Sequence, residues 1–227
     1  MYRYETHLHT LPVSKCAKAT VRETVEFYKA AGYAGIFVTN HFIDGNIDID
    51  RARPYEERIR FYFSDYEEAK RIGDEIGLPV FCGVEMSYGG TDFLVYGLDM
   101  EWFLDHPEIE QMKKSEELAF LKEEGALIIQ AHPYREAAYI DHIRLYPRHV
   151  EGVEIDNASR NAFENEMARM YAEHYGLIPF AGSDNHLGGN KTKFSGMESD
   201  TPIADEADFV CRVRNRQMRL FHWEATE

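Results

Sequence analysis

The sequence predicts an α/β fold in which the strands form a closed or distorted barrel. Strand-like and helix-like segments alternate over all 227 residues, in about seven units, which is typical of a parallel sheet covered by helices on both faces. No glycine-rich dinucleotide loop follows a strand, and this favours a barrel over a Rossmann sheet. The chain also has no internal repeat and no linker rich in Pro, Gly or Ser, so we expect residues 1–227 to form a single domain.

Strands are predicted where short apolar runs lie between turn signals. The runs AGIFVT at 34–39 and ALIIQA at 126–131 are typical of buried strands. The predicted strands cover residues 2–9, 34–39, 79–85, 91–97, 126–131, 150–155, 178–182 and 219–222. Barrels place their chemistry at the C-terminal ends of the strands, so polar residues at these ends are candidates for a site.

Helices are predicted where apolar residues recur every three or four positions. Val21, Val25 and Tyr28 share one face of such a segment, which ends at Gly32. The predicted helices cover residues 20–31, 54–76, 114–124, 161–175 and 206–214. In the fourth helix, the residues expected to point inward are Phe163, Met167, Met170 and Tyr171.

The composition argues against two classes of partner. Forty acidic and 25 basic residues give a formal net charge of −15, and such a surface repels phosphate backbones and anionic membranes. No segment approaches the roughly 20 apolar residues of a membrane helix, and MYRYETHLHT has no apolar signal-peptide core. The 3 cysteines are far apart and do not support a disulfide framework. We therefore expect a cytoplasmic protein with no long nucleic acid and no membrane as partner.

Residues that can bind metal ions follow nearly every predicted strand. His7 with His9, and Asp184 with His186, are two positions apart, and such pairs project to the same side of an extended chain. Imidazole and carboxylate groups together suit zinc, manganese or iron. The candidate metal ligands are His7, His9, His41, Glu85, Asp92, His132, Asp184 and His186. We expect them to converge on one site that holds several ions.

Each of these residues also has an ordinary structural explanation. An isolated HxH pair is often an exposed strand face, Glu85 and Asp184 could cap turns, and His132 could be a core histidine. Five separate strands would then have to place such residues at the same end for unrelated reasons, which favours the metal site. The remaining histidines lack this position and are expected at the surface or as local caps: His106, His142, His149, His174 and His222.

Five motifs, HLHT, TNH, GVE, AHP and GSDNH, occur in this order between His7 and His186. Together they resemble the PHP family, named for polymerase and histidinol phosphatase. The tail DEADFVCRVRNRQMRLF is similar to the family's closing helix and strand. The resemblance implies a distorted (β/α)7 TIM-like barrel, with two or three divalent metal ions at the C-terminal ends of its strands and phosphoester hydrolysis as its activity.

The resemblance also implies which residues bind which ion. His7 and His9 would bind the first metal together with Glu85 and Asp184. Glu85 would bridge to a second metal, which His132 also binds. His41 and His186 would bind a third metal.

The sequence departs from the family pattern at three places. Asn40 stands where an aspartate is common, and Asp92 stands where a histidine often begins a strand. An oxygen ligand at Asp92 would favour manganese over zinc. The loop LPVSKC after the first motif often supplies a further ligand, but protonated Lys15 cannot serve as one. The third metal would then have two clear protein ligands. Separately, Cys16 lies in a loop just after two histidines and is a candidate to approach the site.

The predicted reaction is the hydrolysis of a small phosphomonoester, histidinol-phosphate-like or nucleotide-like. A hydroxide bridging the first two ions would attack phosphorus, and His41 or His186, if free of metal, would protonate the leaving alkoxide. Arg135 and Arg160 are the candidate phosphate-binding residues, because guanidinium forks match phosphate oxygens. Specificity is expected in two loops at the catalytic end, residues 42–54 and 188–202, where Lys191 and Lys193 could form a rim.

Two other functions stay open at this point. A phosphodiesterase or nuclease could use the same site on a short nucleotide, although the chain lacks the basic tracts typical of long nucleic-acid partners. Alternatively, the chain could be a metal-binding regulatory module whose site is degenerate, as Asn40 and Lys15 would suggest. The set expected of an active site is nevertheless complete: His7, His9, Glu85, His132 and Asp184.

Overall fold

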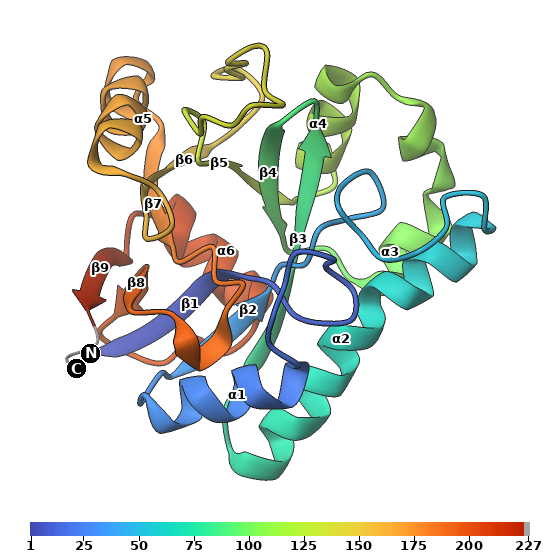
Figure 1. Ribbon diagram of the computed structural model, residues 1–227. Coiled ribbons are helices and arrows are strands. Elements are labelled where there is room, and N and C mark those ends of the chain that lie inside the picture. Colours follow the sequence, from blue (N-terminus) through green and yellow to red (C-terminus); the bar gives the residue numbers. More distant parts are fainter. Residues whose placement is uncertain (225–227) are drawn as a thin grey trace.

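Nine strands and six α-helices form most of residues 1–224, the part of the chain that the computed structural model describes (Figure 1). The strands are β1 (Tyr2–Leu8), β2 (Gly35–Val38), β3 (Val80–Tyr88), β4 (Thr91–Tyr96), β5 (Leu127–Ala131), β6 (Gly152–Asn157), β7 (Ile178–Gly182), β8 (Lys193–Ser199) and β9 (Arg219–Glu224). The α-helices are α1 (Val21–Ala30), α2 (Tyr55–Ile76), α3 (Met100–Asp105), α4 (Lys114–Glu123), α5 (Ala162–Tyr175) and α6 (Glu206–Arg214). Two short 3-10 helices are η1 (Pro107–Gln111) and η2 (Gly188–Asn190).

The strands form one sheet that nearly closes into a barrel. Their order is β7-β6-β5-β4-β3-β2-β1-β8-β9. The chain just after β7 returns to the end of β1, where Leu8 and Asn185 form a parallel bridge and the N–H of His9 donates to the carbonyl of Asn185 (2.9 Å). The barrel therefore closes at the C-terminal end of β1, while β8 and β9 extend the sheet from the first residues of β1. The predicted barrel is confirmed, although it has more strands than the seven expected.

The prediction of a wholly parallel sheet is wrong. The pairs β1–β2, β2–β3, β5–β6 and β6–β7 are parallel, but β3–β4, β4–β5, β1–β8 and β8–β9 are antiparallel. Gly89 and Gly90, both with positive φ, join β3 to β4, and so short a connection requires antiparallel strands. Because β4 runs backwards, its first residues lie at the catalytic edge: Asp92 pairs with Ala131, which precedes His132.

The strand β8 lies in a segment that was expected to be a loop. Its sequence KFSGMES contains small residues that weaken the strand signal. The small residue Gly196 is required, since a Cβ there would lie 2.3 Å from the carbonyl oxygen of Tyr4 and 2.8 Å from the ring of Phe221. Only the start of the loop expected at 188–202 stays at the catalytic edge. Lys193, expected at the rim, is more than half exposed and pairs instead with Glu224 on β9 (3.2 Å).

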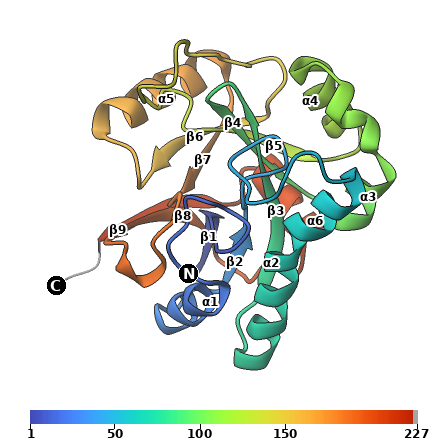
Figure 2. The same cartoon turned by 45° about the vertical axis from the view of Figure 1, so that its right-hand side comes forward.

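The helices lie on the outside of the strands (Figures 1 and 2). The helix α1 begins at a capping box, in which the side chains of Thr20 and Glu23 each accept a hydrogen bond from the other's backbone N–H. In α5 the predicted inward face is partly wrong, because Phe163 and Met170 are exposed. The face that is buried carries Glu164, Ala168, Tyr171 and Ala172.

Aromatic side chains fill the part of the core that lies below the site. Phe209 from α6 packs against Phe37 at 4.2 Å and against Tyr96 at 5.3 Å between ring centroids. The hydroxyl of Tyr96 donates to the carbonyl of Thr6 (2.6 Å), next to His7. The core therefore supports the strand that carries the first two predicted ligands.

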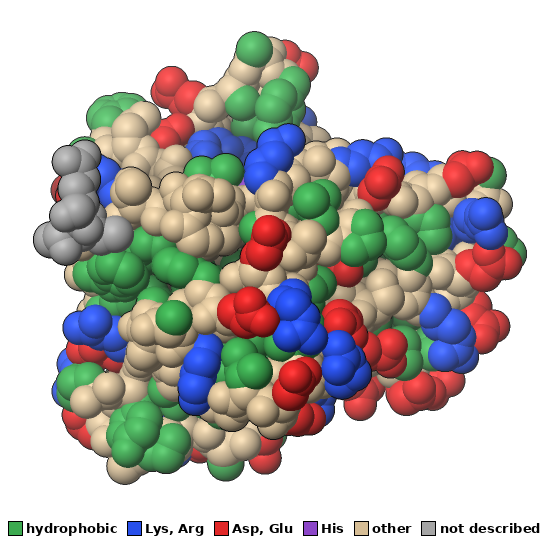
Figure 3. Space-filling view, turned by 60° about the horizontal axis from the view of Figure 1, so that its bottom comes forward, with side chains coloured by type: hydrophobic (Ala, Val, Ile, Leu, Met, Phe, Trp, Pro, Cys, Tyr) green, Lys and Arg blue, Asp and Glu red, His purple; other side chains and the backbone are tan. Residues whose placement is uncertain are grey.

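The helices and one face of the surface complete the description of the fold. None of the described helices is long and apolar enough to cross a membrane. On the face shown in Figure 3, acidic and basic side chains are mixed with apolar ones.

Candidate metal centre

The strand β1 brings two histidines to the same side of the barrel. His7 is the second-last residue of β1 and His9 directly follows the strand, so their side chains project alike. Gly182 at the end of β7 leaves room for them, since a Cβ there would lie 2.5 Å from the Cβ of His7. The buried carboxylate of Glu5 accepts from the backbone N–H of His7 (3.0 Å) and of Ser183 (2.9 Å), which fixes β1 against the end of β7.

Glu85 on β3 lies at the centre of the candidate ligands. Its Oε1 is 3.1 Å from Nε2 of His7 and 3.2 Å from Nε2 of His132. Its Oε2 is 3.5 Å from Nε2 of His9 and 2.6 Å from Nδ1 of His41. A fully buried carboxylate with histidine nitrogens around both oxygens can serve as a metal ligand, and the bridging role that the family resemblance implies for it stays a prediction.

The ligands fall into three overlapping groups, each able to hold an ion. We call them the inner group (His7, Glu85, His132), the middle group (His7, His9, Asp184) and the outer group (His9, His41, His186); within each, the ligand atoms lie within 4.8 Å of one another. The inner and middle groups are buried, whereas the outer group includes the partly exposed His186. The structure thus brings together seven of the eight predicted ligands.

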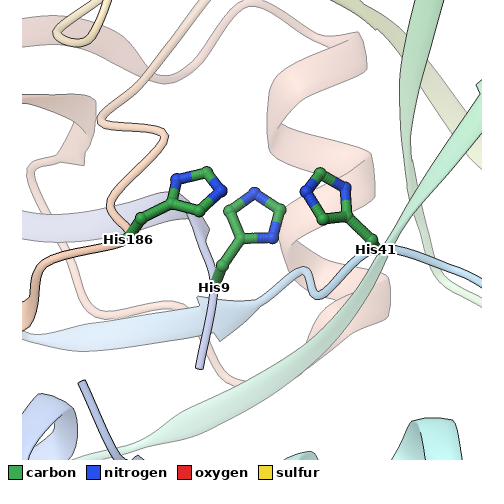
Figure 4. A group of neighbouring side chains, drawn as sticks. All are labelled: His9, His41 and His186. Atoms are coloured by element: carbon green, nitrogen blue, oxygen red, sulfur yellow. The ribbon is translucent and has the colours of Figure 1, made fainter. Parts of the chain in front are cut away.

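The outer group consists of three imidazole rings that lie side by side (Figure 4). They come from the end of β1, the segment after β2 and the segment after β7. The ring centroid of His9 is 4.3 Å from that of His41 and 4.1 Å from that of His186. Asp184 joins this group to the middle one, because its Oδ1 is 3.2 Å from Nδ1 of His186 and 3.5 Å from Nε2 of His9.

The donor atoms fit divalent metal ions. Within residues 1–224, four atoms of the cluster are buried without a hydrogen-bond partner: His7 Nε2, His9 Nε2, His41 Nδ1 and Glu85 Oε2. A buried polar atom without a partner is costly, and most such atoms in native proteins are paired. Nε2 of His9 and Oε2 of Glu85 face each other at 3.5 Å, a separation typical of two ligands of one ion, whereas Nδ1 of His41 lies 2.6 Å from the same oxygen without hydrogen-bond geometry. Imidazole nitrogens and carboxylate oxygens without thiolates suit zinc, manganese or iron in the inner and middle groups.

Burial and charge act against each other in this cluster. Burial disfavours the charged form of His7, but the surrounding carboxylates, Glu154 first among them, outweigh it and raise the pKa of His7 well above its usual range. Burial, together with His186 and His41, holds the pKa of His9 well below its usual range. In a metal-bound protein, an ion replaces the proton as the positive charge that the carboxylates stabilise.

Two ligands sit on unusual backbone. His132 and Asp184 have φ angles of 25° and 50°, in the left-handed region that residues other than glycine seldom adopt. Such strain persists only where the surrounding structure imposes it, and it is common at functional sites. The backbone N–H of His132 donates to Oε2 of Glu154 (3.0 Å), which helps to hold the turn after β5.

Glu154 on β6 is a candidate site residue that the sequence analysis missed. Its Oε1 lies 3.0 Å from Nδ1 of His7, and its Oε2 accepts from the side chain of Asn157 (2.8 Å). A carboxylate behind a ligating histidine fixes the ring and its tautomer. The available signal was an acidic residue inside the otherwise buried strand GVEIDN.

Asn40 is a structural residue of the site. Its Oδ1 accepts from the backbone N–H of Thr10 (2.7 Å) and the hydroxyl of Ser14 (2.8 Å). Its Nδ2 donates to Oδ2 of Asp65 on α2 (3.0 Å). The amide therefore holds the loop after β1 in place, and an asparagine at this position is no sign of a degenerate metal site.

Asp92 is the predicted ligand that stands apart from the three groups. Its Oδ2 is 3.8 Å from Nε2 of His132 but 2.8 Å from Nη2 of Arg135. It is buried at the side of the inner group, so its role as a ligand stays a prediction.

A cleft of about 540 Å³ lies over the ligands, and we call it the metal cleft. Its lining includes Cys16, His41, Asp44, Ser87, Asp92, Arg135, Tyr139, Ser159, Arg160, Asp184 and His186. Both predicted arginines thus reach it, and within the described residues the Nε atoms of Arg135 and Arg160 are buried without a partner. Lys191 lies beside them and donates to the hydroxyl of Ser159 (2.6 Å).

Lys15, whose position raised doubt about a third ligand, points away from the cleft. Its Nζ is 3.6 Å from Oδ1 of Asp48, and both side chains are at least half exposed. The next residue, Cys16, enters the cleft in its place, with Sγ 3.1 Å from Nε2 of His41.

Comparison with known proteins gives the fold. A two-domain protein from Bacteroides vulgatus that contains a PHP-like metal-dependent phosphoesterase matches with a TM-score of 0.69 and 15% identity, over 97% of this chain and 64% of that one. The fold is PHP-like. A protein from Bifidobacterium adolescentis, named as a metal-dependent phosphoesterase, matches at 0.53 and 15% identity, over 83% of this chain and 89% of that one.

Other comparisons limit what the PHP-like fold implies about function. An amidohydrolase from Chromobacterium violaceum, with bound sulfate and no metal, matches at a TM-score of 0.55 and 15% identity, over 96% of this chain and 97% of that one. The chain spans less than two thirds of the Bacteroides protein. No family model and no curated protein matches the sequence. At such identities the likeness establishes the PHP-like fold, and the function has to be argued from the site.

Proposed function

We propose that this chain is a metal-dependent phosphoesterase that hydrolyses a small phosphomonoester, histidinol-phosphate-like or nucleotide-like. One observation carries the proposal: the cluster of buried metal donors opens, through His41, Asp184 and His186, into the cleft that is also lined by Arg135 and Arg160, whose Nε atoms have no hydrogen-bond partner among the described residues. Metal donors alone would suit many hydrolases. Guanidinium groups beside them suit a phosphate dianion, because their fork matches two of its oxygens.

Two or three divalent ions bound here would supply a nucleophile at neutral pH and neutralise charge on the phosphate. The protein residues hold the donors in fixed positions, since Glu85 faces both the inner and the outer group and Glu154 fixes His7 from behind. His41 and His186 lie on the open side of the cluster. While the outer group is free of metal, either imidazole can protonate the leaving oxygen.

The cationic wall supports a phosphate substrate. One Nη of Arg135 is paired with Asp92, and its Nε has no hydrogen-bond partner among the described residues. Asp92 therefore holds the guanidinium in place while Nε stays able to donate to a phosphate oxygen. Arg160 is 4.0 Å from Oδ2 of Asp184, a distance that leaves its guanidinium available to a ligand. Burial lowers the pKa of Lys191, against the raising effect of nearby carboxylates. Its ammonium donates to the hydroxyl of Ser159, the residue before Arg160.

The same geometry weighs against the rival functions. A phosphodiesterase or nuclease would use the same donors, but the net charge of −15 favours a small substrate over a long nucleic acid. A regulatory module with a decayed site has no reason to keep buried, unpartnered ligands.

The test uses the purified full chain, first stripped of metal by a chelator and then loaded with manganese, zinc or iron. We expect hydrolysis of p-nitrophenyl phosphate and none of its bis ester, and no hydrolysis in the stripped protein. Faster hydrolysis of the bis ester would establish the phosphodiesterase instead. Retained metal with no phosphoester hydrolysis at all would favour the regulatory module, and a panel of small phosphorylated metabolites then narrows the substrate.

A further inference from the structure

The loop after β1 places a thiol at the outer group. Sγ of Cys16 is 3.1 Å from Nε2 of His41, and His186 lines the same cleft. His41 is oriented for this contact, because its Nδ1 faces Oε2 of Glu85 at 2.6 Å while its Nε2 faces the sulfur. An imidazole with one nitrogen on a carboxylate and the other on a soft donor has the orientation of a metal ligand.

The position of Cys16 is built by a network centred on Ser14. The hydroxyl of Ser14 donates to Asn40, accepts from the backbone N–H of His41 (3.0 Å) and lies 3.3 Å from Nδ1 of His9. The N–H groups on both sides of Cys16 are also bonded: that of Lys15 to the carbonyl of Asn46 (3.1 Å) and that of Ala17 to the carbonyl of Ser14 (3.1 Å). The thiol is therefore held at the cleft by the fold of the loop.

A second observation points to an ion at the same place. His9 is fully buried, and its Nε2 has no hydrogen-bond partner among residues 1–224 although it faces the outer group. Hydrogen bonds from Cys16 satisfy neither this atom nor Nδ1 of His41. A cation among these rings would contact the unpartnered nitrogen that the thiol does not reach.

We propose that Cys16 is a thiolate ligand of an outer metal ion, which it holds together with His41 and His186. The thiol proton is released to solvent when the sulfur–metal bond forms, and no oxidant or reductant is required. This inference rests on the proposed metal-dependent function and names the ligand set of its outer position. The unpartnered Nε2 of His9 is a further donor beside these three, and the outer ion would share it with the middle group.

The thiolate makes the two ends of the cluster chemically different. The outer position, with one sulfur and two nitrogens, favours zinc or cobalt over manganese or magnesium. The inner position has only nitrogen and oxygen donors, with the carboxylate of Asp92 close by. When this ion is bound, His41 and His186 serve as ligands and do not donate protons to the leaving group.

The experiment titrates the metal-free full chain with cobalt(II). We expect the wild type to develop a sulfur-to-cobalt charge-transfer absorption in the near ultraviolet, and Cys16→Ser to lose this band and one equivalent of bound metal. Cys16→His should regain the equivalent without the band, which separates a lost ligand from a misfolded loop. Cys211→Ser is the matched control, because Cys211 is exposed on α6, and it should keep both the band and the stoichiometry.

Alkylation provides an independent measurement. Bound zinc should protect Cys16 from iodoacetamide, whereas Cys211 should react equally with and without metal. Metal binding without the band, or an unchanged band and stoichiometry in Cys16→Ser, overturns the ligand proposal and leaves the phosphoesterase intact. A band without phosphoester hydrolysis supports the ligand and overturns the proposed function, and a chain that binds no metal at all overturns both.

Discussion

Two cavities lie next to each other in this protein, and among the described residues only one of them adjoins buried polar atoms without a hydrogen-bond partner. The metal cleft has a volume of about 540 Å³, and a second cavity beside it has a volume of about 740 Å³. They share Asp44 and Ser87. The second cavity is the larger and has its own buried lysine, Lys114, so size and charge alone would select it as the reaction site.

The partners of the charged groups separate the two cavities. In the second cavity, Arg58 makes two hydrogen bonds to Glu110 (2.6 and 2.7 Å), and Lys114 bonds to Asp44 (3.0 Å) and Glu117 (2.6 Å). In and directly below the metal cleft, among the described residues, four candidate ligand atoms and two arginine Nε atoms are buried without hydrogen-bond partners. Buried polar atoms are normally paired, so unpartnered ones beside a cleft point to a ligand. The comparison therefore assigns chemistry to the smaller cavity.

The largest expected effect follows from replacing Glu85 by glutamine. The substitution keeps the size of the side chain but removes the charge at the centre of the four histidines. An ion supplies several kcal/mol of transition-state stabilisation, so its loss should lower kcat/KM about 10³-fold. The measurement is p-nitrophenyl phosphate hydrolysis together with the bound metal content, and both should fall.

The matched control for this variant is Glu110→Gln in the second cavity, which should leave kcat/KM within about twofold of the wild type. If the two variants lost activity alike, the assignment of the reaction to the metal cleft would be wrong. If Glu85→Gln kept its activity while its metal content fell, the metal dependence itself would be wrong.

A smaller effect is expected from Glu154→Gln, which acts on metal binding through His7. Loss of the carboxylate behind a ligating histidine typically weakens metal affinity about 10- to 100-fold. We expect this loss in a competition titration against a chelator, with kcat largely restored at saturating metal. Recovery at high metal distinguishes a positioning role from a direct role in the reaction, and a kcat that stays low at saturation would contradict the prediction.

A third variant, Arg160→Met, tests the cationic wall of the metal cleft. A charge-assisted hydrogen bond is worth about 1.5–3 kcal/mol, so kcat/KM for a phosphomonoester should fall by roughly tenfold or more without loss of metal. Arg169→Met is the control, because Arg169 lies on α5 with its side chain about half exposed. Equal activity in the two variants would remove Arg160 from the phosphate site.

The strand ends explain why so much of the metal centre could be predicted. Ligands such as His7, Glu85 and His132 follow apolar runs, and parallel strands bring the ends of such runs to the same edge of a barrel. Asp92 lies at the site for another reason: it is near the start of a strand that runs antiparallel to its neighbours. The sequence pattern placed it correctly beside the site although the predicted strand direction was wrong.

The remaining parts of the site depend on contacts that have no local signal. Glu154 becomes recognisable only when β6 lies behind His7, and Asn40 only when the loop after β1 folds onto it. Whether the side chain of Lys15 or that of Cys16 enters the cleft depends on hydrogen bonds between residues more than 20 positions apart, such as that between Ser14 and Asn40. Periodicity and strand position cannot predict such contacts, because they arise from tertiary packing.

The smallest effect on catalysis is expected in the second cavity, where Glu117→Gln should change stability instead. Burial raises the pKa of Glu117 to about 7, against the lowering effect of Lys114. Between the unfolded value of about 4.5 and pH 7, the folded protein keeps a proton that the unfolded chain loses, so the free energy of unfolding falls as pH rises. The slope is at most about 1.4 kcal/mol per pH unit, and Glu117→Gln should reduce it.

The measurement is urea denaturation of the metal-free protein across this pH range, with Glu123→Gln on the exposed side of α4 as the control. Because the metal ligands titrate equally in all three proteins, only the difference in slope reports on Glu117. In Glu117→Gln, kcat/KM should change less than about twofold, since Glu117 forms an ion pair with Lys114 and does not line the metal cleft. A fall in kcat/KM as large as that of Arg160→Met would mean that the substrate extends into the second cavity, and the paired charges there would then belong to its recognition.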